Sequence, residues 1–131
     1  MLEIMLCDLC GKLAMIVREG GRRTICCDQL MEKLPEQGKG SVASDEVTHV
    51  PIIEKTKNGI RVRVPAVENP MREEHYIEWI EVTKGKDLHV HRLAPGDAPD
   101  AEFPIHDTNV KARVYCEQHG IWSNKPAKLN S

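Results

Sequence analysis

The chain has 131 residues, a formal net charge of −2 and a hydrophobic content of 40%. This length suits one ordinary domain, or one domain with a small metal-stabilised module. The small net charge does not predict binding to nucleic acid or to an anionic membrane, and no segment is apolar for long enough to span a bilayer. The N-terminus has neither the basic region nor the cleavage site of a signal peptide, so we expect a cytoplasmic protein.

Residues 1–36 are expected to form a separate unit, because they hold four of the five cysteines and few large apolar side chains. Gly20-Gly21 suggests a hairpin turn in the middle of this unit. So small a unit buries little apolar surface, and a metal ion would have to stabilise it. The next residues are rich in Gly, Pro and polar side chains, which predicts a linker over 37–45.

The N-terminal cysteines have a spacing typical of metal ligands. Cys7 and Cys10 are two residues apart, so a tight turn can place both sulfurs on one side. Cys26 and Cys27 are adjacent, and both reach one ion only if the backbone bends sharply there. An odd number of cysteines argues against a closed disulfide framework. Four thiolates suit either zinc or iron. A redox-active dithiol pair and inert thiols are the remaining alternatives.

We expect residues 46–131 to form a small β-sandwich, because short segments with strand-like patterns alternate there with turn signals. Asn58-Gly59 predicts a hairpin turn between a strand within 47–54 and another that begins at Ile60. Further strands are expected at 76–83, 88–93 and 110–116. We find no convincing long amphipathic helix, so we expect a mainly β protein.

A second group of metal-ligand residues is dispersed through this β-rich part. Its members are His49, His75, Cys116 and His119. The last two lie three positions apart and are followed by Gly120, so a single turn can offer both a sulfur and a nitrogen. Three imidazoles and one thiolate suit a transition metal rather than Ca²⁺ or Mg²⁺. The other three histidines are expected not to be ligands: His89, His91 and His106.

A set of segments spread over nearly the whole chain forms a recognisable pattern. They are Cys7-x-x-Cys10 with Cys26-Cys27, His49-Val50-Pro51-Ile52-Ile53-Glu54-Lys55, Pro70-Met71, Glu73-Glu74-His75-Tyr76-Ile77-Glu78-Trp79-Ile80, Pro95-Gly96-Asp97-Ala98-Pro99, Ala101-Glu102-Phe103 and Cys116-x-x-His119-Gly120-x-Trp122. With these segments the chain resembles the desulfoferrodoxins, the superoxide reductases with two iron centres. The resemblance implies a desulforedoxin-like domain with a four-cysteine iron, followed by an immunoglobulin-like β-sandwich with a second mononuclear iron.

The resemblance also implies roles for the dispersed ligands. In the family, four equatorial histidines and one axial cysteine hold the second iron and leave one position open. His49, His75 and His119 would therefore be equatorial ligands and Cys116 the axial ligand. Superoxide would gain one electron and leave as hydrogen peroxide without release of dioxygen, a detoxification under oxidative stress that suits an anaerobe. A rubredoxin-like electron donor and a homodimer are implied as well.

Two positions depart from the family pattern. The family's remaining equatorial histidine precedes Pro-Met, and here that residue is Asn69. An amide oxygen is a poorer partner for ferrous iron, so the site would have three histidines and a water, or would bind Asn69 weakly. The family's Glu-Lys pair before the first ligand is replaced by Val47-Thr48. Without that lysine, association with superoxide is expected to be slower and less salt-dependent.

The sequence thus favours an impaired superoxide reductase with iron in both centres, zinc being the alternative metal in either. Two other functions stay open. A rubredoxin-like electron-transfer protein would work through the four-cysteine iron alone, and a metal-binding or sensor module would have no catalytic role. Colour and EPR distinguish iron from zinc, and the peroxide yield from a superoxide flux distinguishes the enzyme from the electron carrier.

Overall fold

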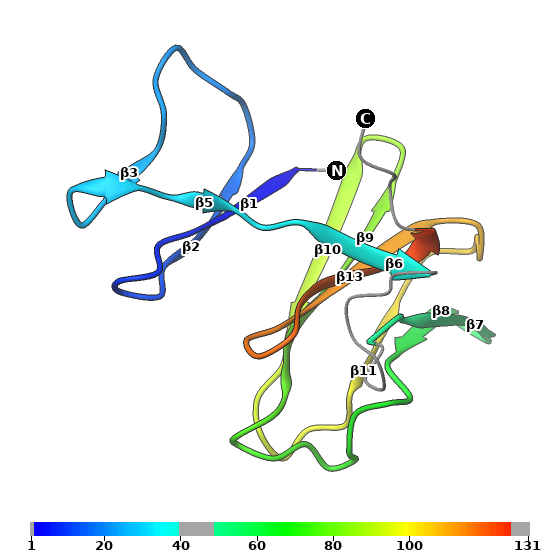
Figure 1. Ribbon diagram of the computed structural model, residues 1–131. Helices are drawn as coiled ribbons and strands as arrows, with labels where there is room; N and C mark the ends of the chain where they lie inside the picture. The colour runs from blue at the N-terminus through cyan, green and yellow to red at the C-terminus, as the bar shows by residue number, and fades with distance from the viewer. Residues whose placement is uncertain (1, 40–48, 127–131) are drawn as a thin grey trace. The chain divides into compact units, whose positions relative to one another are not determined.

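The computed structural model describes residues 2–39 and 49–126, and these residues form β-strands with no helix among them (Figure 1). Within these residues, then, no helix exists that could cross a membrane. The chain divides into two compact units, Met1–Pro35 and Glu36–Ser131. The prediction of a small cysteine-bearing unit followed by a β-sandwich is confirmed.

The first unit contains five short strands. They are β1 (Glu3–Leu6), β2 (Leu13–Ile16), β3 (Ile25–Cys26), β4 (Gln29–Leu30) and β5 (Glu32–Lys33). Antiparallel pairing gives a sheet of order β2-β1-β5 and a separate β3–β4 ribbon. Ile4, Cys7 and Met31 are its buried apolar residues. So small a core stabilises a domain weakly, which agrees with the expectation that a metal ion is needed.

The prediction of a hairpin turn at Gly20-Gly21 is wrong. The strands on either side of this pair are β2 and β3, which do not pair with each other; β2 pairs with β1, and β3 with β4. Neither glycine is among the residues with positive φ. The glycine pair therefore lies in a wide connection and does not supply the backbone conformation of a tight turn.

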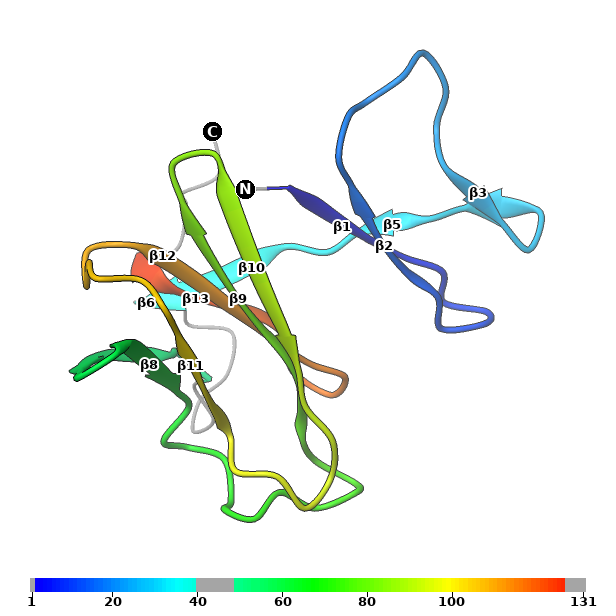
Figure 2. The ribbon, with the colours of Figure 1, turned by 180° about the vertical axis from the view of Figure 1, so that it is seen from behind.

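The second unit contains two sheets that pack face to face (Figures 1 and 2). Its strands are β6 (Glu36–Lys39), β7 (Ile52–Thr56), β8 (Gly59–Arg63), β9 (Ile77–Lys84), β10 (Asp87–Arg92), β11 (Asp100–Phe103), β12 (Lys111–Cys116) and β13 (Gly120–Pro126). The larger sheet has the order β10-β9-β12-β13-β6 and the smaller one β11-β8-β7. Their facing side chains form the core, which includes Ile60, Val62, Ile80, Val82, Val114 and Trp122.

The predicted hairpin at Asn58-Gly59 is confirmed, and it joins β7 to β8. Gly59 has φ +153°, and a Cβ atom there would lie 2.0 Å from the carbonyl oxygen of Phe103 on β11. Only glycine lets these two strands approach so closely. The hairpin thus fixes the smaller sheet against its third strand.

The linker predicted at 37–45 is wrong at its start. Residues 37–39 belong to β6, which lies parallel to β13 with Gln37 opposite Trp122. The rest of that segment lies outside the described residues, as does the start of the strand expected within 47–54. A Gly- and polar-rich composition predicts a loop because it lacks β-branched residues, but here hydrogen bonds to β13 form a strand.

A buried ion-pair network joins the strands of the larger sheet. Arg113 on β12 contacts both carboxylate oxygens of Glu81 on β9, each at 3.0 Å. Glu36 on β6 lies 3.5 Å from Arg113 and 2.6 Å from Lys111. Arg113 and Glu81 are buried. These charges cross-link β6, β9 and β12 on the sheet face opposite the core.

Candidate metal centres

The first candidate centre is the group of four cysteines in the N-terminal unit. The sulfurs of Cys7, Cys10, Cys26 and Cys27 all lie within 4.8 Å of one another. Cys26 Sγ lies 3.6 Å from Cys10 Sγ and 3.9 Å from Cys27 Sγ. Four sulfurs at about 2.3 Å from one ion, at tetrahedral angles, are separated by about 3.8 Å. The four thiols therefore fit a tetrahedral metal site.

The backbone bends at both ends of this cysteine group. Cys27 and Asp28 have φ of 55° and 61°, a left-handed conformation that is uncommon for residues other than glycine. This is the sharp bend that two adjacent ligands require. At the other end, the N–H of Gly11, with φ 83°, donates to the Cys7 carbonyl oxygen at 2.8 Å. Each pair of ligands is therefore held by a tight local turn.

The proximity of the sulfurs changes their acidity. A backbone hydrogen bond from Cys10 lowers the pKa of Cys7 to about 7. The pKa of Cys26 is raised to about 12, chiefly by its hydrogen bond with the Cys10 sulfur. Neighbouring thiols share protons in this way because several negative charges in one place repel each other. A bound cation removes this conflict, so the chemistry of the group favours a metal.

The second candidate centre brings together side chains from distant parts of the β-sandwich. The donor atoms of His49, His75, Cys116 and His119 all lie within 4.8 Å of one another. The Nε2 atoms of His49 and His75 are 3.0 Å apart. Two nitrogens at about 2.1 Å from one ion are separated by about 3.0 Å at a right angle and by about 3.4 Å at the tetrahedral angle. The observed distance is short enough for one ion to bind both nitrogens.

Each ligand of the second centre lies at a strand end or in a turn. His49 precedes β7 and is fully buried, and His75 lies just before β9. Cys116 ends β12, and His119 lies in the turn before β13, where its N–H donates to the Cys116 carbonyl oxygen at 3.1 Å. The Trp122 ring is stacked at 6.0 Å from the His49 ring. Three connections of the sandwich thus supply the site.

Burial sets the protonation of the two ligands in the β12–β13 turn. It raises the pKa of the Cys116 thiol and lowers the pKa of the His119 imidazole. His119 is therefore neutral near pH 7 and can offer a lone pair, whereas Cys116 needs a nearby cation to become a thiolate. Cys116 Sγ lies 3.5 Å from His119 Nδ1, so one ion can bind both. Three imidazoles and one sulfur suit iron or zinc.

Acidic side chains surround the Cys116 side of this centre. A small depression beside the ligands is lined by Glu73, Glu74, His75, Tyr76, Cys116, Glu117 and Gln118. Burial, and then the charge of Glu117, raise the pKa of nearby Glu78. The Gln118 amide donates to the Glu74 carbonyl oxygen and connects the two turns that supply Cys116 and His75. This lining contains three glutamates and neither lysine nor arginine, so this side does not attract an anion.

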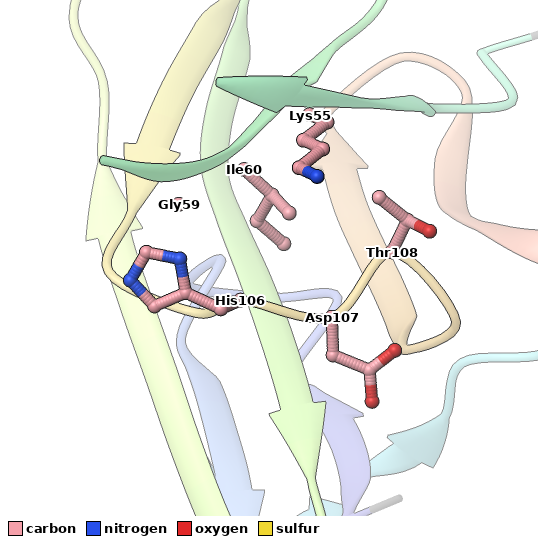
Figure 3. A pocket seen from close by; sticks show the side chains of 6 residues that line it. All are labelled: Lys55, Gly59, Ile60, His106, Asp107 and Thr108. Carbon is pink, nitrogen blue, oxygen red and sulfur yellow. The ribbon is translucent and has the colours of Figure 1, made fainter. Parts of the chain in front are cut away.

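Among the described residues, neither group includes His89, His91 or His106. Asn69 is exposed, and its role as a ligand stays a prediction. Val47 and Thr48 lie outside the described residues. His89 packs edge-on against Phe103, and His91 is exposed. His106 lines a separate pocket of about 260 Å³ together with Lys55, Gly59, Ile60, Asp107 and Thr108 (Figure 3).

Sequence analysis missed one residue near the second centre. Gln37 on β6 donates a hydrogen bond from Nε2 to the His119 carbonyl oxygen at 2.7 Å. No motif or spacing marks this residue, because it stands in a polar, Gly-rich segment that is far from His119 in sequence. Only the parallel pairing of β6 with β13 brings the two together.

A four-thiolate site in a small unit and a three-histidine, one-cysteine site in a β-sandwich define a class of small metalloproteins with two mononuclear centres. The family model described as desulfoferrodoxin matches residues 41–125. Desulfoferrodoxin from Syntrophotalea carbinolica is 40% identical over 124 residues, which are 95% of this chain and 96% of that protein. Desulfoferrodoxin from Nitratidesulfovibrio vulgaris is 44% identical over 92% of this chain and 93% of its own length.

A solved structure agrees with these sequence relatives. The superoxide reductase from Treponema pallidum matches with a TM-score of 0.70 and 27% identity, over 95% of this chain and 98% of that one. The chain belongs to the desulfoferrodoxin family.

Proposed function

We propose that the protein is a superoxide reductase, an oxidoreductase that converts superoxide, one electron and two protons into hydrogen peroxide at the second centre. The observation that carries this function is the convergence of His49, His75, Cys116 and His119 on one point. Membership of the desulfoferrodoxin family and the likeness to the Treponema pallidum superoxide reductase support it.

The residues of the second centre suit this reaction. Iron bound there would supply the electron to superoxide. Neutral imidazoles from His49, His75 and His119 would hold it, and the buried Cys116 would bind as a thiolate that donates electron density to the metal. Four protein donors would leave such an iron with open positions for a small anion, because non-haem iron centres commonly keep positions that no protein ligand fills. The His49 ring is fully buried beside Trp122, so water is excluded from that side.

The four-cysteine centre is proposed to carry iron and to receive electrons from a rubredoxin-like donor. Cys10 and Cys27 are exposed at its edge. Three large apolar side chains near these thiols are exposed as well: Leu9 by 66%, Ile25 by 65% and Leu30 by 47%. Ile25 and Leu30 are cross-strand neighbours on β3 and β4. An exposed apolar surface beside a redox centre suits brief docking of a small electron carrier.

Oligomeric state and compartment belong to the same proposal. Strand β10 is an edge of the larger sheet and leaves Leu88 and Val90 exposed, which supports a homodimer. All five cysteines are free thiols, which supports a reducing compartment such as the cytoplasm. Analytical ultracentrifugation tests the dimer, since a monomer at micromolar concentration would contradict it.

The test of the proposed function is the yield of hydrogen peroxide from a measured superoxide flux. Iron-loaded protein with a reductant should form one peroxide for each superoxide consumed, whereas dismutation forms one for every two. Cys116→Ser and zinc-loaded protein are the controls, because each removes the redox chemistry of the second centre. A yield no higher than that of the zinc-loaded protein would overturn the proposal.

An electron-transfer protein is the second candidate, because the position of the family's fourth histidine carries an exposed asparagine, Asn69. In that case the four-cysteine iron would exchange electrons with a donor while superoxide was consumed no faster than without protein. The same flux experiment therefore separates the two functions.

A further inference from the structure

The backbone carbonyl of one ligand residue in the second centre is held from two sides. The His119 carbonyl oxygen accepts one hydrogen bond from Trp122 Nε1 at 2.9 Å and another from Gln37 Nε2 at 2.7 Å. Both donors are side chains, and they come from different strands, β13 and β6. Two directed donors on one carbonyl fix the plane of its peptide, and this peptide joins His119 to Gly120.

The turn around His119 is built to receive the Gln37 amide. Gln37 lies opposite Trp122 in the parallel β6–β13 pairing, and its Nε2 is also 3.5 Å from the Ile121 carbonyl oxygen. Gly120 has φ +84°, and a Cβ atom there would lie 3.1 Å from Gln37 Nε2. Glycine therefore permits both the left-handed turn and the close approach of the amide.

We propose that Gln37 is a positioning residue of the second metal centre. By holding the carbonyl of His119, its amide fixes where the imidazole stands relative to the Cys116 sulfur, 3.5 Å from Nδ1. Residues that orient metal ligands in this way commonly change metal affinity or activity 10- to 100-fold, roughly, when they are replaced. The inference deepens the proposed function but rests only on the second centre, and it is tested without superoxide.

The competing explanation is that Gln37 merely joins β6 to β13. Strand β6 has other attachments that serve this purpose, because Glu36 contacts both Lys111 and Arg113. A purely structural role predicts lower stability with an unchanged metal site. A positioning role predicts a changed site, even at equal stability.

The experiment compares full-length, iron-loaded variants. Gln37→Met keeps the length of the side chain and removes the donor, Gln37→Glu replaces the donor with an acceptor, and Lys39→Met alters an exposed residue of the same strand. The readouts are the wavelength of the sulfur-to-iron absorption band of the second centre and the retention of its iron against a chelator. Absorption of the four-cysteine centre in the same molecule is the internal reference.

Gln37→Met is expected to shift this band and to retain iron about tenfold less tightly than the parent protein. Gln37→Glu is expected to retain iron still less tightly. Lys39→Met should match the parent in both readouts. Where a variant is partly unfolded, the folded fraction is isolated by gel filtration before measurement. An unchanged band and unchanged retention in folded Gln37→Met protein would overturn the proposal, whatever the loss of stability.

A double-mutant cycle adds an independent test. Trp122→Phe removes the other donor to the same oxygen while it keeps an aromatic ring beside His49. Because both donors act on one carbonyl, the losses of iron retention in the single variants should not add in the double variant. Additive losses would show that Gln37 does not act through the His119 carbonyl.

Discussion

Replacing Glu81 with glutamine tests whether the buried ion pair holds the larger sheet together. Glu81 is fully buried, and both of its carboxylate oxygens lie 3.0 Å from Arg113 Nη2. Removing one partner of a buried pair costs about 3–5 kcal/mol, because the other charge stays out of water. Glu36 remains 3.5 Å from Arg113 and offsets part of this loss, so we expect the lower end, about 3 kcal/mol.

Urea unfolding of iron-loaded protein, compared at equal iron content, measures this loss. With a slope of roughly 1.5 kcal/mol per molar, the midpoint should fall by about 2 M. The matched control is Glu54→Gln, because Glu54 pairs with Arg63 at 3.1 Å and the two side chains are 44% and 40% exposed. An exposed pair of this kind contributes at most about 1 kcal/mol. Equal midpoints for Glu81→Gln and Glu54→Gln would refute the reasoning.

Four further predictions concern the metal sites and the fold. Asn69→His should raise the iron content of the second centre, and equal iron in the two proteins after parallel purification would contradict it. Superoxide association, measured by pulse radiolysis, should be slower and less salt-dependent than in family members that have lysine at the position of Thr48, and a fast rate that falls steeply with added salt would contradict this. Gly59→Ala should abolish folded protein, as judged by gel filtration, because its Cβ would meet the Phe103 carbonyl at 2.0 Å. Ile25→Ser should slow reduction of the four-cysteine centre by reduced rubredoxin while the absorption spectrum stays unchanged.

The alternation of apolar and charged residues predicts burial correctly on one strand of the smaller sheet and incorrectly on one strand of the larger sheet. Ile60 and Val62 are buried on β8 while Arg61 is exposed, as the alternation of apolar and charged residues predicts. On β12 the same rule is wrong for Arg113 and Tyr115, which are buried on the outer face. Arg113 is covered by its ion pairs, and Tyr115 stacks on Trp79 at 4.6 Å. The burial of Arg113 and Tyr115 depends on residues of neighbouring strands. The residue pattern of β12 alone therefore does not predict it.

Sequence analysis left out β6 and β13 for a related reason. Both strands contain polar residues and glycine, and β13 ends in proline, so their intrinsic strand propensity is weak. They form because β13 pairs with both β12 and β6. The consequence for function is direct, since these two strands supply the side-chain donors to the His119 carbonyl.

The ligand types of the second centre were predictable from residue chemistry, but their convergence was predictable only from the family resemblance and not from residue spacing. Only Cys116 and His119 are close enough in sequence for spacing to link them. The contact with His75 depends on an irregularity between β12 and β9: Tyr115 pairs with Trp79, yet the next residue, Cys116, pairs with Ile77. A bulge of this kind inserts an extra residue into one strand and changes the direction of the side chains beside it. This shift brings the Cys116 sulfur to the end of β9 where His75 lies. The metal centre therefore depends on a change of strand register that the spacing of residues in the sequence does not reveal.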